Sequence, residues 1–127
     1  MTMLRILVVE DDDAIRELLE FAFREAGHET ISAIDGQHAL RLAMASQPDV
    51  VVMDLGLPIM SGPEFVMSWR AHLGTPGPPI VVISGRPDVM EVARGLDARA
   101  AFAKPFDIEV LVATVSQTPL ALRRQLA

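Results

Sequence analysis

The sequence of 127 residues contains no cysteine, so it can build neither a disulfide framework nor a zinc site with thiolate ligands. No apolar run approaches the roughly 20 residues needed to cross a bilayer. Only four apolar residues separate Arg5 from a run of acids, which is too short and too acidic for a signal peptide. We therefore expect a soluble protein that stays in the cytoplasm and does not engage a membrane.

Clustered positive charge is also missing. The chain has 11 Lys and Arg against 17 Asp and Glu, a formal net charge of -6, and Arg123-Arg124 is its only adjacent basic pair. Binding to nucleic acid requires Lys and Arg grouped against phosphates, so we expect no nucleic-acid binding by this chain itself. Half of the residues are hydrophobic, which together with the length indicates one globular domain.

Short aliphatic runs alternate along the chain with segments of helical spacing. We expect strands at 3–9, 50–53 and 79–83, and weaker ones at 29–33 and 99–103. We expect helices at 14–26, 36–45, 61–73, 88–96 and 107–115. The alternation predicts an α/β fold with a parallel sheet and right-handed crossovers. We assign residues 1–118 to this domain, and 119–127 either extend its last helix or begin a linker.

The predicted strands end in residues that carry chemistry. The first is followed by Glu10 and Asp11, the third by Asp54, the fourth by Ser84 and the fifth by Lys104. Ligands of open α/β sheets bind beyond the carboxyl ends of the strands, so these side chains should meet at one rim. Three carboxylates that meet there must share protons or hold a hard cation, and an all-oxygen ligand set suits Mg²⁺.

The lysine and the hydroxyl across such a site suit a phosphoryl group, and a central aspartate can itself be the nucleophile. Each residue also has a purely structural interpretation. Asp12 and Asp13 fit the cap and first turn of a helix better than a metal site. Asp54 alone fits a turn equally well, and Ser84 and Lys104 are ordinary turn residues when considered singly. The histidines show no ligand spacing, and we expect all of them to be solvated: His28, His38 and His72.

Taken together, four motifs resemble the receiver domain of two-component response regulators. They are "ILVVEDD", "PDVVVMDLGLPIMSG", "PPIVVISG" and "FAKPF", in family order over about residues 4–117. The resemblance implies a doubly wound, flavodoxin-like sheet of five parallel strands in the order 2-1-3-4-5, flanked by five helices. It also implies a regulatory domain that catalyses its own phosphorylation and dephosphorylation, not a metabolic enzyme.

The resemblance further implies a role for each residue at the rim. Asp54 is the phosphoacceptor, Asp11 a direct Mg²⁺ ligand, and Glu10 an acid that reaches the metal, often through water. The carbonyl group of Gly56 completes the metal shell together with Asp54. Ser84 supplies the hydroxyl that bonds the phosphoryl group.

Lys104 is the lysine that neutralises the phosphoryl group in this resemblance, and the Lys104–Pro105 bond is expected to be cis. The phosphoryl group comes from a phosphohistidine of a histidine kinase or phosphotransfer protein. Its arrival shifts an equilibrium between two forms of a surface that binds a downstream protein. The domain works as a monomer or as a dimer that forms on phosphorylation.

The sequence departs from the family pattern at several positions. Ala101 replaces the usual aromatic residue three positions before the lysine, and the neighbouring Phe102 should face the other side of the sheet. Asp97 replaces a usual glycine and can adopt a left-handed turn. The positions that tune phosphoryl lifetime in the family are Gly56, which leaves the attacking water uncrowded, and Arg86, which could screen the phosphoryl group.

Two other functions compete with the receiver. A phosphatase of the haloacid dehalogenase type requires a second aspartate two residues after the nucleophilic one. The position two residues after Asp54 in this chain is Gly56. A pseudo-receiver would only bind protein, and the presence of Asp54, Asp11 and Lys104 argues against it.

Overall fold

The computed structural model describes residues 2–74 and 77–126, with side chains as far as Thr118. In this part of the chain five strands and five helices alternate, and the strands form one parallel sheet in the order β2-β1-β3-β4-β5, which confirms the predicted fold class. The strands are β1 (Arg5–Val9), β2 (Glu29–Ala33), β3 (Val50–Asp54), β4 (Ile80–Ser84) and β5 (Ala100–Ala103). The helices are α1 (Asp13–Glu25), α2 (Gly36–Ser46), α3 (Gly62–Leu73), α4 (Val89–Gly95) and α5 (Ile108–Leu126).

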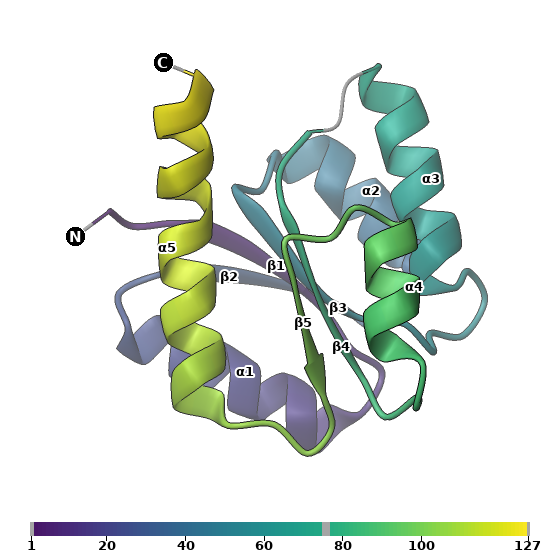
Figure 1. Ribbon diagram of the computed structural model, residues 1–127, viewed down its shortest axis with the longest axis horizontal. Helices are drawn as coiled ribbons and strands as arrows, with labels where there is room; N and C mark the ends of the chain where they lie inside the picture. The colour runs from purple at the N-terminus through teal and green to yellow at the C-terminus, as the bar shows by residue number, and fades with distance from the viewer. Residues whose placement is uncertain (1, 75–76, 127) are drawn as a thin grey trace.

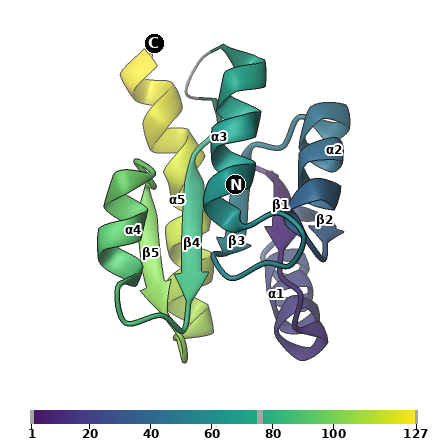
Figure 2. The same ribbon diagram turned by 90° about the vertical axis from the view of Figure 1, so that its right-hand side faces the viewer.

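Helices cover both faces of the sheet (Figures 1 and 2). Side chains of a strand alternate between the faces, so β1 feeds two separate cores. Leu7 and Val9 pack in the core under α2, α3 and α4, whereas Ile6 and Val8 pack in the core under α1 and α5. Every residue of β3 and β4 is buried, as expected for central strands covered on both sides.

Polar side chains cap the first turns of α1, α2 and α3. The Asp12 carboxylate accepts a hydrogen bond from the Ile15 backbone N–H at 3.0 Å, and Asp13 lies in the first turn of α1. Asp35 and Ser61 cap α2 and α3 in the same way. These bonds satisfy amide groups that have no partner within the helix, which confirms the structural interpretation of Asp12 and Asp13.

Helix α5 is longer than predicted. It continues to Leu126, past the end near Val115 that the apolar spacing predicted and in agreement with the alternative in which the residues after 118 extend this helix. The buried side chains of Leu111, Val115 and Thr118 follow one stripe, so the face that packs on the sheet extends past Val115. The other boundaries differ from the prediction by at most two residues. Within residues 2–74 and 77–126, no helix combines the length and the apolar character that a membrane span requires.

The prediction that all histidines are solvated is wrong for His28. Its side chain is 7% exposed, Nδ1 accepts a hydrogen bond from the Leu4 backbone N–H at 3.1 Å, and Nε2 lies 2.9 Å from Ser116 Oγ. Because Ser116 Oγ itself donates to the Val112 carbonyl group, the hydroxyl accepts from the Nε2–H group. Ser116 lies 88 positions away in the sequence, so no local pattern could reveal this contact.

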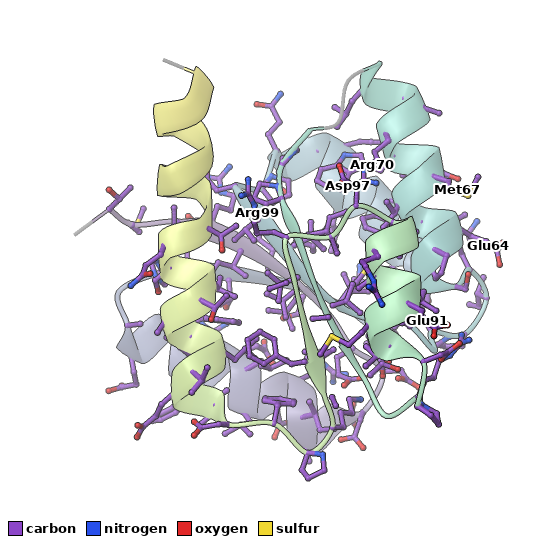
Figure 3. The ribbon with its side chains drawn as sticks, in the orientation of Figure 1. Glu64, Met67, Arg70, Glu91, Asp97 and Arg99 are labelled. Atoms are coloured by element: carbon purple, nitrogen blue, oxygen red, sulfur yellow. The ribbon has the colours of Figure 1, made fainter. Side chains whose placement is uncertain are left out.

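A side chain of α3 bonds the turn between α4 and β5. Arg70 donates a side-chain hydrogen bond to the Leu96 carbonyl group, and Figure 3 shows its side chain beside the adjacent Asp97. Asp97 has φ of +54°, which confirms the left-handed turn predicted there.

Candidate functional site

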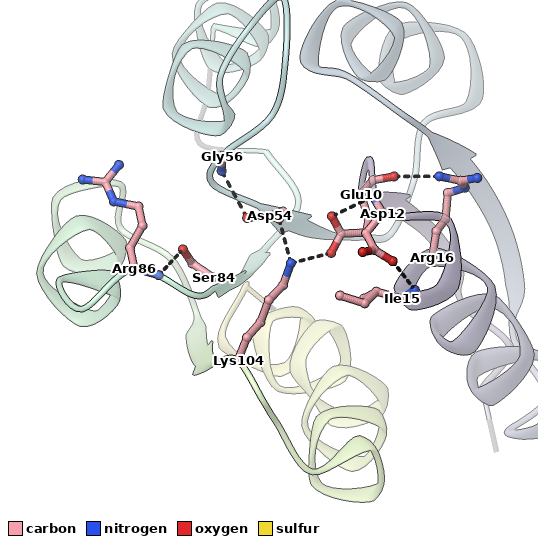
Figure 4. Close-up of polar contacts among 9 residues, drawn as sticks. All are labelled: Glu10, Asp12, Ile15, Arg16, Asp54, Gly56, Ser84, Arg86 and Lys104. Carbon is pink, nitrogen blue, oxygen red and sulfur yellow. Dashed lines mark hydrogen bonds and ion pairs between the residues drawn. The ribbon is translucent and has the colours of Figure 1, made fainter.

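The carboxyl ends of the strands gather four of the predicted side chains at one rim, and Figure 4 shows three of them, Glu10, Asp54 and Lys104. Glu10 and Asp11 follow β1, Asp54 ends the neighbouring β3, and Lys104 follows β5. The Lys104 backbone N–H donates to the Ser84 carbonyl group at 2.8 Å, which fixes the lysine beside the end of β4. The sheet order, not the chain order, therefore assembles the site.

Three carboxylates form the acidic side of this rim. Glu10, Asp11 and Asp54 each place one carboxylate oxygen within 4.8 Å of the others. Glu10 is 0% exposed and Asp54 is 8% exposed, whereas Asp11 is open to solvent. A set of hard oxygen donors with one open side fits Mg²⁺, which keeps several water ligands.

Lys104 joins two of these acids. Its Nζ lies 2.7 Å from Glu10 Oε1 and 2.8 Å from Asp54 Oδ2, and the Lys104–Pro105 peptide bond is cis, as predicted. One ammonium group thus faces two carboxylates in a partly buried setting, where charge interactions are stronger than in water.

The two buried acids differ in protonation behaviour. Burial raises the pKa of Glu10 to about 7, because the hydrogen bond from Lys104 offsets only part of that cost and the charge of Asp54 adds to it. Burial also acts to raise the pKa of Asp54, but hydrogen bonds from Lys104 and the Gly56 N–H outweigh it and lower the pKa overall. Burial would lower the pKa of Lys104, yet its bonds to Asp54 and Glu10 raise it. At neutral pH Asp54 is therefore an anion and Lys104 a cation.

Gly56 and Ser84 complete the set of predicted residues. The Gly56 backbone N–H donates to Asp54 Oδ1 at 3.1 Å, and the glycine places no side chain over the carboxylate. Ser84 is 1% exposed and lies on β4, beside the strand that ends at Asp54. Its Oγ accepts a hydrogen bond from the Arg86 backbone N–H at 3.0 Å.

Arg16 is part of the surroundings of the site and was not among the predicted residues. Its Nη1 donates to the Glu10 carbonyl group at 3.0 Å, and its Nη2 lies 2.6 Å from Asp13 Oδ1. The i,i+3 spacing of Asp13 and Arg16 was the available signal, but it does not reveal that the same guanidinium group reaches back to the end of β1.

Ala101, which replaces the usual aromatic residue, and its neighbour Phe102 lie on β5. Ala101 packs with the core under α2, α3 and α4, and Phe102 packs with the opposite core, as their alternation predicts. A hollow of about 380 Å³ lies between α4 and β5. It is lined by Met90, Ala93, Arg94, Ala98, Ala100 and Ala101.

A family model described as "Response regulator receiver domain" matches residues 6–116. Among curated proteins, the chain is 38% identical over 113 residues to the transcriptional regulatory protein PrrA of Mycobacterium tuberculosis, covering 87% of this chain and 48% of that protein. The DNA-binding response regulator MtrA of Mycolicibacterium smegmatis gives the same identity and coverage. The chain therefore spans about half the length of the curated relatives that it matches.

The chain is also similar in structure to solved proteins. The chemotaxis response regulator CheY4 of Vibrio cholerae superposes with a TM-score of 0.83 at 30% identity, covering 92% of this chain and 99% of that chain. NtrX from Brucella abortus superposes with a TM-score of 0.87 at 27% identity, covering 98% of this chain and 29% of that one.

Proposed function

The chain belongs to the response regulator receiver domain family of two-component systems, and from this premise we propose that Asp54 accepts a phosphoryl group from the phosphohistidine of a histidine kinase or phosphotransfer protein. The observation that carries the proposal is the position of Lys104. Its ammonium group bonds both Glu10 and Asp54 where three carboxylates converge. This arrangement provides an anionic nucleophile, a fixed cation and a set of metal ligands in one pocket.

Asp54 is the nucleophile of the proposed transfer. The lowered pKa keeps it ionised, and Lys104 and the Gly56 N–H hold its carboxylate in one orientation at the end of β3. A carboxylate oxygen of Asp54 attacks phosphorus, the phosphorus–nitrogen bond of the phosphohistidine breaks with its electron pair left on nitrogen, and the ring leaves as a neutral imidazole with the proton that its other nitrogen already carries. Orientation and charge neutralisation provide most of the catalysis in phosphoryl transfer.

The acids supply a binding site for Mg²⁺. Glu10, Asp11, Asp54 and the carbonyl group of Gly56 would hold the ion, and when bound it supplies positive charge against the phosphoryl oxygens. The convergence of three carboxylate oxygens within 4.8 Å supports this assignment.

Lys104 and Ser84 contact the phosphoryl group in this proposal. Lys104 exchanges one of its carboxylate partners for a phosphoryl oxygen, and the Ser84 hydroxyl donates to another. Ser84 is buried beside the end of β3, and its hydrogen on Oγ remains available because the Arg86 N–H uses an oxygen lone pair. Movement of Ser84 would carry the signal to α4 and β5.

The competing functions receive less support. Gly56 provides no second carboxylate for a dehalogenase-type phosphatase, and its N–H instead bonds Asp54. A pseudo-receiver would have no need for Asp54, Asp11 and Lys104 in one pocket. The names of PrrA and MtrA describe a transcriptional regulator and a DNA-binding response regulator. For residues 1–118 of this chain we propose contacts with protein partners. We further propose that the domain acts in the cytoplasm, as a monomer or as a dimer that forms on phosphorylation.

The test is phosphorylation of the purified chain with acetyl phosphate and Mg²⁺, followed by intact-mass measurement. We expect one added phosphate, abolished by Asp54→Asn and by chelation of the metal. Asp35→Asn is the matched control, because asparagine caps a helix as well as aspartate and Asp35 lies at the start of α2. Persistent labelling of the Asp54→Asn protein at the original yield would show that another residue is the acceptor.

A further inference from the structure

The backbone of Arg86 lies beside Ser84, but its side chain, with the positive charge, is turned away from Asp54 (Figure 4). The Arg86 backbone N–H lies 3.0 Å from Ser84 Oγ, the hydroxyl that we assign to the phosphoryl group. The Cα atom of Arg86 therefore lies near the proposed phosphoryl site. The direction of its side chain depends on the anion that its guanidinium group contacts.

The anion that it contacts is Asp88. Arg86 Nε donates to Asp88 Oδ1 and Arg86 Nη2 donates to Asp88 Oδ2, both at 2.9 Å. This is the two-pronged pairing of a guanidinium with a carboxylate, which fixes orientation as well as distance. Both side chains are exposed, at 51% and 42%, so the pair is weak enough to exchange with a stronger anion.

Asp88 also stands out by the bond that it does not make. It occupies the N-cap position of α4, yet its side chain makes no capping hydrogen bond. Asp12, Asp35 and Ser61 do cap their helices, as such residues ordinarily do. The Asp88 carboxylate is engaged by Arg86 instead of by the amide groups of the helix.

We propose that Asp88 is a positioning residue that holds the Arg86 guanidinium group off the phosphoryl group of Asp54 and thereby shortens its lifetime. The proposal rests on the proposed function, because it takes Asp54 as the acceptor. A guanidinium group released from Asp88 donates two N–H groups to two phosphoryl oxygens and covers the side that faces solvent.

Hydrolysis requires access from that side. Water attacks phosphorus in line with the bond to Asp54, a new oxygen–phosphorus bond forms, and the bond between phosphorus and the Asp54 oxygen breaks. The carboxylate is restored and the proton of the water leaves with inorganic phosphate. Release of Arg86 therefore slows the loss of phosphate, and the pairing with Asp88 keeps the loss fast.

The experiment compares the lifetimes of four proteins: the natural chain, Asp88→Asn, Arg86→Gln and the double variant. Each is phosphorylated with acetyl phosphate and Mg²⁺, freed of donor, and followed by intact mass. Asparagine keeps the capping preference of the position and removes the charge. We expect Asp88→Asn to retain phosphate roughly two- to fivefold longer, the range by which an exposed ion pair shifts a population. The double variant should match Arg86→Gln alone.

Two controls make the result specific. Glu20→Gln removes the acid of the Arg24–Glu20 pair on α1 and should leave the lifetime unchanged. Asp88→Ser, which also suits a cap, should reproduce the effect of Asp88→Asn.

Three outcomes would overturn the proposal. An unchanged or shorter lifetime in Asp88→Asn would show that Arg86 is not restrained in the way described. Equal slowing in the Arg86→Gln background would show that Asp88 acts through another residue. A natural chain that takes up no phosphate would refute the acceptor role of Asp54, and this is seen before any lifetime is measured.

Discussion

Glu10 and Asp54 share one lysine and one pocket, but their carboxyl groups behave differently. Glu10 is wholly buried, and burial dominates its pKa, which rises to about 7. Asp54 has the Gly56 N–H in addition to Lys104, and its pKa falls. The residue with the lowered pKa is the one that we propose as the phosphoacceptor, and the pattern of hydrogen bonds keeps it in the anionic form that such a role needs.

His28 shows the same dependence on surroundings at the opposite end of the sheet. Burial lowers the pKa of its imidazole, and the neutral ring accepts from Leu4 at Nδ1, a bond that the protonated ring cannot make. Below about pH 6.5 the unfolded chain takes up a proton at this residue before the folded chain does. The contribution of His28 to stability is therefore present above that pH and is lost as the pH falls toward the lowered pKa of the folded state.

This predicts a specific effect of His28→Gln on the free energy of unfolding. At pH 7.5 the variant should be less stable by about 1–2 kcal/mol, because the contacts with Leu4 and Ser116 are weakened. The difference in unfolding free energy between the natural chain and the variant should become smaller as the pH is lowered from 7.5 to 5, as measured by urea denaturation. Other titrating groups, such as Glu10, are present in both proteins, so their effect on the unfolding free energy cancels in the difference between the two. A difference that stays constant would contradict the assignment, and exposed His72→Gln should show no difference at any pH.

At the scale of elements, the contact of α3 with the end of β3 determines where Asp54 lies. Gly62 is the first residue of α3, and a Cβ atom there would lie 2.9 Å from the Asp54 carbonyl oxygen and 3.1 Å from Leu55 Cα. Both neighbours are backbone atoms, so they cannot move aside as a flexible side chain would. The absence of a side chain at Gly62 therefore permits the close approach of the helix to the strand end.

We predict that Gly62→Ala displaces the end of β3. Overpacking of this kind costs about 1–3 kcal/mol of unfolding free energy. Labelling of Asp54 by acetyl phosphate should slow as well, because its carboxylate moves relative to Lys104. Gly95→Ala is the matched control, since a Cβ atom at Gly95 meets nothing within 4 Å. Equal stability and equal labelling of the Gly62 variant would show that the helix accommodates the methyl group without moving the strand.

The pairing of α4 with β5 leaves the hollow next to Ala101. We predict that Ala101→Tyr places its ring there and changes the rate of phosphorylation by less than about twofold, because the position is separate from the reacting groups. Phe102→Ala, on the opposite face, should instead destabilise the fold, by less than the ~3–5 kcal/mol lost with a fully buried phenylalanine, because Phe102 is only partly buried. Labelling rates and thermal melting of the two variants test the separation. A large loss of transfer rate in Ala101→Tyr would place this residue in the chemistry.

At the scale of the whole molecule, one sheet brings together residues that lie up to 94 positions apart, Glu10 and Lys104 being the extreme pair. Two helix layers bury the sheet on both sides and leave the carboxyl ends of the strands accessible. The rim is thus the place where polar side chains meet without disturbing either core.

The extent of the autonomous unit is a prediction at this scale. Leu111, Val115 and Thr118 are buried side chains of α5, and the boundary proposed from the sequence lies at 118, directly after them. We expect a chain that ends at Thr118 to fold and to label like the longer one, as measured by circular dichroism and intact mass. Removal of a further turn, so that the chain ends at Thr114, should destabilise it because Val115 is lost from the core. Unfolding of the chain that ends at Thr118 would place the boundary further along.

The alternation of aliphatic runs with helical spacing determined the fold class, because burial on two faces leaves a signature within each segment. The residue types after the strands indicated where the candidate site lies, because parallel strands put their carboxyl ends on one side of the sheet. Sequence alone could not determine the direction of the Arg86 side chain, the contact of Arg16 with Glu10, or the burial of His28 against Ser116. These contacts depend on groups that meet only after the chain has folded. The spacing of residues within one helix or strand therefore does not predict them.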